Sequence, residues 1–323
     1  MPDLVTHQYF GKRVLESLPE TAVNHIRQDI FYHTTPGPDV WFTLGFYGGA
    51  NKAKAPRGNY MHTHETGAFL QMLAEECRRC EDKDGLFSYL SGFLCHYALD
   101  TVAHPYIVYR TGEYDGSEET LPYRGNHTRL ERAIDCHVIR HFYGSAPGRF
   151  SITDEVLALK SLPESLREPL NGVYTAVYGW ENVWEDLNAA ISDQRLFYRL
   201  MRGRTGLVNA LTGVFNDGKS HIDYRLLSYH DRELDMDKVD CLNRQHSRWY
   251  YPYDPSRSST ASFPELMEIA RQKAHRLIEI IYDYVYRNAD YDLASMIGND
   301  SYSTGLDCAD PGNDRPGFFA PLF

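Results

Sequence analysis

The stretch Phe93-Leu-Cys-His-Tyr-Ala-Leu-Asp-Thr-Val-Ala-His-Pro105 decides the fold, because it places three potential metal ligands on one apolar helix. His96, Asp100 and His104 follow one another at intervals of four residues. Four residues is just over one helical turn, so neighbours in this series can share an ion. His96 and His104 lie about 12 Å apart along such a helix and cannot hold the same ion. The spacing therefore predicts two or more metals bridged by Asp100, with phosphoester hydrolysis as the leading reaction class.

A second helical stretch, Asn126-His-Thr-Arg-Leu-Glu-Arg-Ala-Ile-Asp135, repeats this pattern. His127 and Glu131 again lie one turn apart, and Asp135 extends the same face. Carboxylates buried on an amphipathic helix need a partner, and a metal cation can serve both them and neutral imidazoles. We expect Glu131 to bind metal and Asp135 to hydrogen-bond a ligating imidazole, which would fix the orientation of that ring.

Apolar residues recur with helical spacing along almost the whole chain, and strand-like alternation is scarce. We therefore predict an all-α fold, a multi-helix bundle with a multinuclear metal cleft. Residues 1–145 are expected to form a metal-binding helical core and residues 146–323 a helical extension packed on it, unless both form one continuous domain. The periodicity predicts helices over residues 7–18, 21–32, 65–80, 85–109, 126–143, 164–180, 182–202, 205–215 and 263–289.

The segments between these helices carry turn-forming and capping residues. Ser262, with Glu265 three residues later, predicts a capping box at the start of the long final helix. Residues 299–323 are rich in Gly, Pro, Asn and Asp but end in Phe-Phe-Ala-Pro-Leu-Phe, which suggests a docked tail. The polar stretches expected to be loops are 110–125, 216–237 and 250–261.

Composition indicates a soluble enzyme. The 323 residues carry a net charge of -11, and the pI is near 5.7. This balance argues against a basic nucleic-acid-binding surface, so we expect no stable nucleic-acid partner. The first twenty residues lack the pattern of a signal peptide, and no apolar run approaches the length of a membrane span, so we expect a cytoplasmic protein. The six cysteines are scattered apart from one Cys-Arg-Arg-Cys pair and are interpreted as free thiols.

The order of the ligand-type residues resembles that of the zinc-dependent phospholipase C family, whose fold is shared by the single-strand-specific nucleases. The pattern covers about the first 145 residues, and the rest of the chain resembles an uncharacterised cytoplasmic branch of the family. Along the chain the matching residues are His7, Asp39 in a Gly-Pro-Asp motif, a histidine at 62 or 64, His96, Asp100, His104, His127 and Glu131.

The resemblance implies how these residues would share zinc ions. Asp39, one of the two histidines, His96 and Asp100 would hold one ion. His104, His127 and Glu131 would hold a second. His7 and Asp100 would bind a third, giving two or three ions in all. Iron, manganese or nickel would suit the same ligands, so zinc itself follows from the resemblance.

Two ligand positions in this set are not fixed by the resemblance: the histidine at 62 or 64, and the N-terminal ligand of the third ion. We favour His62, which lies just before a predicted helix, over His64, whose alternative interpretation is a surface residue at the helix entry. In the known enzymes the third ion is completed by the amino group and carbonyl of a mature N-terminal tryptophan. This chain has no such residue, but removal of Met1 would expose Pro2 five residues before His7. We therefore expect the Pro2 amine and carbonyl to serve as ligands.

The resemblance implies a hydrolase in which metal-activated water attacks a phosphodiester or a phosphorylated headgroup, with Asp39 orienting or deprotonating that water. The partner would be a phosphoester small molecule or a phospholipid headgroup. One alternative is a nuclease or nucleotidase with the same metals. Another is a non-catalytic helical protein with structural metals, but about eight side chains shared among three ions would leave coordination positions open, which favours catalysis. The sequence leaves the oligomeric state open.

Overall fold

The fold is all-α, as the periodicity predicted. A computed structural model describes residues 4–201, 229, 239–310 and 317–323. The helices are α1 (Leu4–Leu15), α2 (Glu20–Val23), α3 (Gln28–Thr34), α4 (Arg57–Thr63), α5 (Thr66–Arg79), α6 (Lys83–Thr111), α7 (Asn126–Phe142), α8 (Ile152–Glu155), α9 (Arg167–Tyr178), α10 (Val183–Leu200), α12 (Phe263–Tyr286) and α13 (Leu293–Ile297). Short 3₁₀ helices are η1 (Gly37–Thr43), η2 (Ala50–Lys54), η3 (Leu121–Tyr123) and η4 (Glu164–Leu166).

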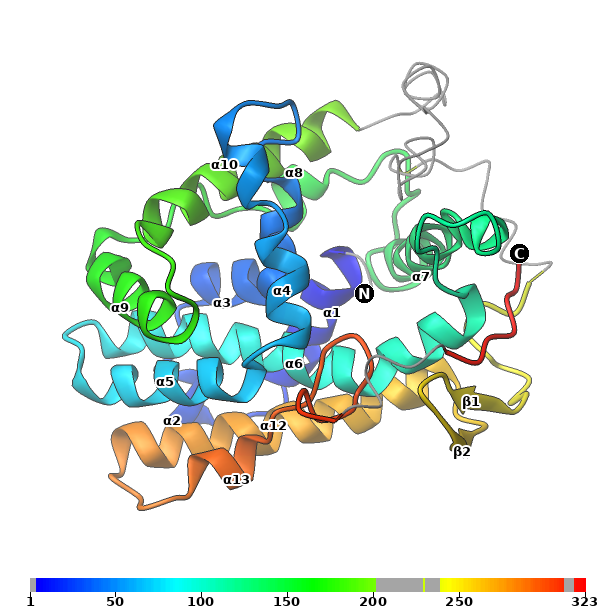
Figure 1. Cartoon of the computed structure of the whole chain (residues 1–323). Helices are drawn as coiled ribbons and strands as arrows, with labels where there is room; N and C mark the ends of the chain where they lie inside the picture. The colour runs from blue at the N-terminus through cyan, green and yellow to red at the C-terminus, as the bar shows by residue number, and fades with distance from the viewer. Residues whose placement is uncertain (1–3, 202–228, 230–238, 311–316) are drawn as a thin grey trace.

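Helix α6 is the central element of the fold (Figure 1). Almost every one of its 29 residues is buried, because α1, α3, α5, α7 and α12 all pack on it. Asp82 caps its first turn by accepting a hydrogen bond from the backbone N–H of Gly85 at 2.9 Å. Gly92 lets α3 approach closely, since a Cβ atom there would lie 2.0 Å from the hydroxyl of Thr34. Because α6 is buried on nearly all sides, it can present ligand side chains to several neighbouring helices.

Helix α12 covers one side of α6 and starts where the sequence predicted. Ser262 accepts a hydrogen bond from the backbone N–H of Glu265 and donates its own N–H to that carboxylate, so the capping box is confirmed. The chain end lies against the end of α6, where Ala320 and Leu322 donate backbone hydrogen bonds to the carbonyls of Tyr109 and Arg110. Residues 317–323 therefore dock on the helical body.

Two predictions of local structure were wrong. The single helix expected over 21–32 is divided into α2 and α3, because Arg27 is extended and donates its N–H to the hydroxyl of Ser88 on α6 at 2.7 Å. The loop expected over 250–261 contains a hairpin of β1 (Trp249–Tyr251) and β2 (Asp254–Ser259). Its second strand is polar and largely exposed, which hides it from a pattern search. The predicted helix 205–215 and most of the predicted loop 216–237 lie outside the described residues.

The largest buried cluster takes side chains from both sides of residue 145, including Phe10 and Leu99 on one side and Leu277 and Ile281 on the other. The division into a core of residues 1–145 and an extension of 146–323 stays a proposal. Within the described residues, no helix combines the length and apolar character that crossing a membrane requires.

Candidate metal centre

Eight of the nine residues predicted as ligands come together in three groups, and His96 belongs to two of them. They are supplied by α1, η1, α4, α6 and α7. The groups are His7, His96 and Asp100; Asp39, His62 and His96; and His104, His127 and Glu131. Within each group the candidate ligand atoms all lie within 4.8 Å of one another, so each group could hold a metal ion. The ninth residue, Pro2, lies outside the described residues.

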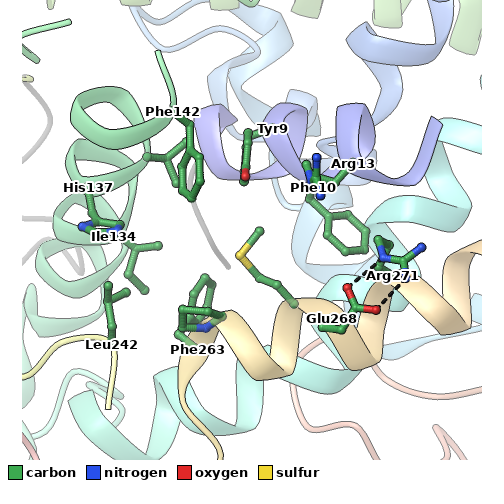
Figure 2. A pocket seen from close by; sticks show the side chains of 13 residues that line it. Tyr9, Phe10, Arg13, Ile134, His137, Phe142, Leu242, Phe263, Glu268 and Arg271 are labelled. Carbon is green, nitrogen blue, oxygen red and sulfur yellow. Dashed lines mark hydrogen bonds and ion pairs between the residues drawn. The ribbon is translucent and has the colours of Figure 1, made fainter. Parts of the chain in front are cut away.

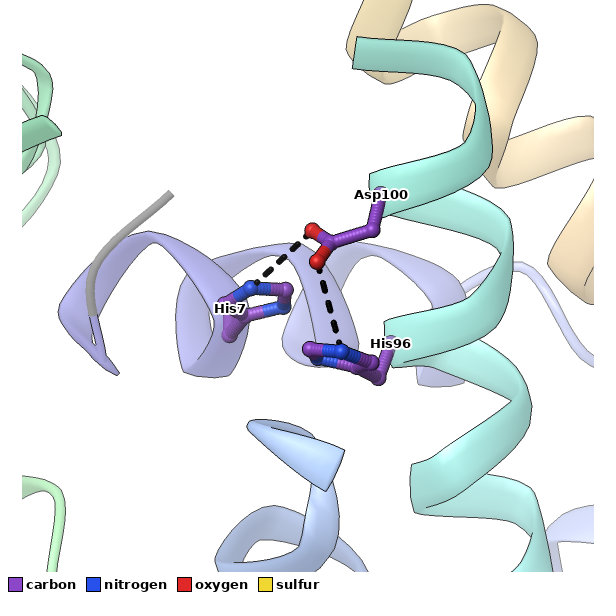
Figure 3. Close-up of side chains that lie close together, drawn as sticks. All are labelled: His7, His96 and Asp100. Atoms are coloured by element: carbon purple, nitrogen blue, oxygen red, sulfur yellow. Dashed lines mark ion pairs between the residues drawn. The ribbon is translucent and has the colours of Figure 1, made fainter. Parts of the chain in front are cut away.

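In the first group the carboxylate of Asp100 lies between two imidazoles (Figure 3). One oxygen is 3.3 Å from Nε2 of His7 and the other is 3.3 Å from Nε2 of His96. The two rings stack with their centroids 4.6 Å apart. All three side chains are fully buried. Helix α1 crosses α6 at this point, so one residue from α1 meets two successive turns of α6.

The polar atoms of this group fit a bound cation. Within the described residues, no hydrogen bond reaches either ring nitrogen of His7 or His96 or either oxygen of Asp100. An uncompensated polar group in the interior costs several kcal/mol, and a charged one costs more. Burial lowers the pKa of His96, which keeps that imidazole in the neutral form that binds metals. Imidazole nitrogens and carboxylate oxygens are a typical donor set for zinc.

In the second group Asp39 faces His62. Oδ1 of Asp39 lies 3.3 Å from Nε2 of His62, and burial raises the pKa of the carboxyl group. Nδ1 of His62 lies 2.6 Å from the carbonyl oxygen of Gly58, which can only accept, so Nδ1 carries the proton. With the proton on Nδ1, an unprotonated Nε2 would direct its lone pair at the Asp39 oxygen. A proton or cation between these atoms would remove the repulsion.

The structure separates the two histidines that the sequence left as alternatives. His64 is exposed and stacks on Tyr60 with ring centroids 4.1 Å apart. It belongs to none of the three groups, whereas His62 does. The reason lies in the helix: His62 is in the last turn of α4 and points inward, while His64 follows as its C-cap.

The third group lies between α6 and α7. Nε2 of His104 is 3.3 Å from Nε2 of His127, and the latter is 2.8 Å from Oε1 of Glu131. Nδ1 of His104 lies 2.6 Å from the carbonyl oxygen of Ser303, so its proton is on Nδ1 and Nε2 is available toward His127. The side chain of His127 is 36% exposed, so this group, unlike the first, opens to solvent.

Asp100 groups with His7 and His96 but not with Asp39 and His62, whereas His104 lies with His127 and Glu131 in the grouping that the resemblance implies. Asp135 has partners that the sequence did not suggest, because its oxygens accept the backbone N–H groups of Val5 and Thr6 at 3.1 and 2.8 Å. Asp135 therefore fixes the first turn of α1, which carries His7. Ser303 is a partner of the site that the sequence did not reveal, since nothing in its surroundings has a ligand pattern.

An apolar pocket of about 140 Å³ lies between α1, α7 and α12 (Figure 2). Tyr9 and Arg13 line it from α1, and Phe263 and Met267 line it from α12. None of the eight candidate ligands lines the pocket, so it is separate from the three ligand groups.

Comparison with known protein families agrees with this geometry. Residues 6–165 match the family described as zinc dependent phospholipase C. The match spans all eight residues of the three groups, from His7 to Glu131. The class of protein is therefore a metal-dependent phosphoester hydrolase. The chain belongs to the zinc-dependent phospholipase C family. No curated protein and no solved structure matches it.

Proposed function

We propose that this protein hydrolyses a phosphodiester or a phosphorylated headgroup, using zinc ions held by the three groups. The observation that carries the proposal is that a chain of the phospholipase C family gathers three sets of imidazoles and carboxylates around one stretch of α6. The ligands we propose are His7, Asp39, His62, His96, Asp100, His104, His127 and Glu131, with the amine and carbonyl of Pro2.

The number of ligands in each group supports catalytic rather than structural metals. Once His96, which belongs to two groups, is assigned to one ion, each group offers two or three protein side chains. That is no more than the three usual for catalytic zinc, whereas structural zinc has four. Open coordination positions leave room for water and substrate. The partial exposure of the His127 and Asp39 side chains supports open positions that face solvent rather than the core.

Bound zinc would lower the pKa of a water that attacks phosphorus and would stabilise the charge on the phosphoryl oxygens. The protein supplies orientation and a proton acceptor. His62 and His104 keep their protons on Nδ1 through the carbonyls of Gly58 and Ser303, so both direct Nε2 into the site. The side chain of Asp39 is 15% exposed and that of Asp100 is 0% exposed. Asp39 is therefore the carboxylate that can meet the attacking water and accept its proton.

The first experiment is metal analysis by plasma mass spectrometry on untagged protein whose N-terminus has been mapped. It is paired with hydrolysis of bis-p-nitrophenyl phosphate, p-nitrophenyl phosphorylcholine and single-stranded DNA. We expect two or three metals per chain and turnover of the small phosphodiesters. Fewer than two metals after reconstitution, with no turnover, would contradict the proposal. Preferential cleavage of DNA would favour a nuclease.

A matched pair of variants tests the ligand assignment. His62→Ala should lose metal and turnover, because it removes a member of the second group. His64→Ala is the control, since this exposed neighbour lies two residues away and outside the groups. Equal metal content in the two variants would contradict the choice of His62.

The Pro2 assignment has its own test. A residue left ahead of Pro2 would convert its amine into an amide, which cannot bind metal in the same way. We expect such a protein to hold fewer metals than the protein that starts at Pro2. Full metal content and full activity with a retained N-terminal extension would refute the assignment.

A further inference from the structure

We infer that residues 298–308, which lie outside the part of the chain matched to the family, position two of the metal ligands. This 298–308 segment follows α13 and packs across α6 beside the end of α4 (Figure 1). The inference rests on the proposed metal site and extends it, because it assigns a role in metal binding to a part of the chain that supplies no ligand.

The segment holds His104 directly. The Ser303 carbonyl is the acceptor for Nδ1 of His104 at 2.6 Å. A carbonyl has no proton to give, so this bond selects the tautomer in which Nε2 carries the lone pair. The same bond fixes the ring about its χ angles with Nε2 toward His127. Partners of this kind, outside the ligands themselves, typically change metal affinity by about 10–100-fold.

The segment also holds His62 through the last turn of α4. The carbonyl of His62 accepts the backbone N–H of Tyr302 at 2.8 Å and the hydroxyl of Ser301 at 3.2 Å. Carbonyls in the last turn of a helix have no partner within the helix, so these bonds define where α4 ends. The ring of Tyr302 packs edge-on against His62 and His96, with centroids 5.4 and 5.0 Å away.

Anchors away from the ligands keep the segment in place. Lys273 on α12 donates hydrogen bonds to Asp300 and to the hydroxyl of Thr101, both at 2.9 Å. Tyr97 on α6 donates to the carbonyl of Ile297 at 2.8 Å, just ahead of the segment. The hydroxyl of Thr66, at the start of α5, donates to the carbonyl of Asp300 at 2.9 Å. Three helices therefore hold the segment independently of any metal.

At Gly305 the segment packs directly against the backbone of α6. Its φ is +66°, in the left-handed region, and a Cβ atom there would lie 2.5 Å from the backbone carbonyl oxygen of Thr101. Thr101 follows Asp100 and precedes His104 by three residues. A side chain at residue 305 would therefore push the segment away from the ligand-bearing turns of α6, because the backbone of a buried helix cannot yield.

The test compares Gly305→Ala with Gly144→Ala. Gly144 also has a positive φ, +61°, but a Cβ atom there would have nothing within 4 Å, so this control carries the backbone strain without the displacement. Zinc affinity is measured by competition with a chromophoric chelator. We expect Gly305→Ala to bind zinc about 10–100-fold more weakly than the wild type. Gly144→Ala should stay within twofold.

A second readout does not involve metal. In zinc-free protein with ¹⁵N-labelled histidine, the imidazole nitrogen shifts report which nitrogen carries the proton. We expect wild-type His104 to be protonated on Nδ1 and Gly305→Ala to lose that preference. A purely structural segment would change the melting temperature of the zinc-free protein without changing this tautomer.

If Gly305→Ala does not fold, Tyr302 provides a milder pair. Tyr302→Leu removes the ring that packs against His62 and His96, and Tyr302→Phe keeps it. Weaker zinc binding in the first variant alone would support the inference. Wild-type affinity in a folded Gly305→Ala, or in Tyr302→Leu, would overturn it. Failure of the wild type to bind zinc would instead overturn the proposed function.

Discussion

Gly37 lies directly against the imidazole of His96, so that a Cβ atom at residue 37 would be 2.5 Å from Cγ of the ring. Its φ of +54° is in the left-handed region, which glycine adopts without strain. The contact brings η1, which carries Asp39, against α6, which carries His96. The Gly-Pro-Asp motif therefore combines a residue that permits close approach with one that serves as a candidate ligand.

We expect Gly37→Ala to destabilise the protein by about 2–5 kcal/mol, from left-handed backbone strain and overpacking together. It should also weaken zinc binding, because Asp39 would be pushed away from His96. Urea unfolding with and without zinc measures both effects. Gly179→Ala is the control, since Gly179 has a φ of +70° but open space around its Cβ position. Equal losses in the two variants would show that contact with His96 is unimportant.

Asp100→Asn should destabilise the zinc-bound protein but not the zinc-free protein. In the zinc-free protein the buried carboxylate has no hydrogen bond within the described residues, so removing its charge should leave stability unchanged or raise it. With zinc present the variant should lose much of the stabilisation that ligand binding gives the wild type. Melting temperatures with chelator and with excess zinc test this. Wild-type metal content in Asp100→Asn would refute the assignment of Asp100 as a ligand.

Asp135→Asn should destabilise the protein even without metal. The carboxylate accepts bonds from the N–H groups of Val5 and Thr6 and from the hydroxyl of Tyr229 at 2.6 Å, and an amide cannot accept all of them equally well. It also places negative charge at the N-terminus of α1, where the helix dipole favours it. We expect a loss of about 2–4 kcal/mol, because hydrogen bonds to buried charged groups are strong.

The control for Asp135 is Asp154→Asn, in which an exposed carboxylate that accepts from Ser151 is changed. It should shift stability by less than about 0.5 kcal/mol. Asp135→Asn should also lower zinc affinity through displacement of His7, whereas Asp154→Asn should not. Unchanged unfolding of Asp135→Asn would contradict the role of this residue in anchoring α1.

The candidate ligands on α6 and α7 could be predicted from the sequence because four-residue spacing puts side chains on one helical face. His7 and Asp39 could be found only by resemblance, since each is a lone residue in its own segment. The partners of these ligands could not be found. Asp135 accepts a hydrogen bond from the backbone of Thr6, and the backbone carbonyl of Ser303 lies against His104. In both contacts the partners are more than a hundred residues apart in the sequence, so the contacts leave no local pattern.

The same reasoning explains the errors in secondary structure. The break between α2 and α3 depends on a hydrogen bond from Arg27 to Ser88, 61 residues further on. The hairpin depends on burial of Trp249, while its second strand consists of polar residues that also suit a loop. Hydrophobic periodicity and capping residues therefore predicted the helices that depend on local interactions. They failed where the structure depends on contacts between residues far apart in the sequence.

His33 should make the stability of the zinc-free protein fall in mild acid. It is buried on α3, and burial, with a smaller effect of Arg195, lowers the pKa of its imidazole from 6.5 to about 4. Above pH 6.5 the ring is neutral in the folded protein and in the unfolded chain, so it does not change the stability. Between pH 6.5 and 4 the unfolded chain takes up a proton that the folded protein does not, so stability is lost as the pH falls, and the loss levels off below pH 4.

This shift corresponds to about 3 kcal/mol between pH 7 and pH 4, and the variant His33→Leu should not show that part of the pH dependence. Urea unfolding across this range, with chelator present, measures the difference between the two proteins. Buried histidines of the metal groups titrate in both proteins, so their contribution cancels in the difference. Parallel curves for wild type and variant would mean that His33 takes up its proton as readily in the folded state as in the unfolded chain.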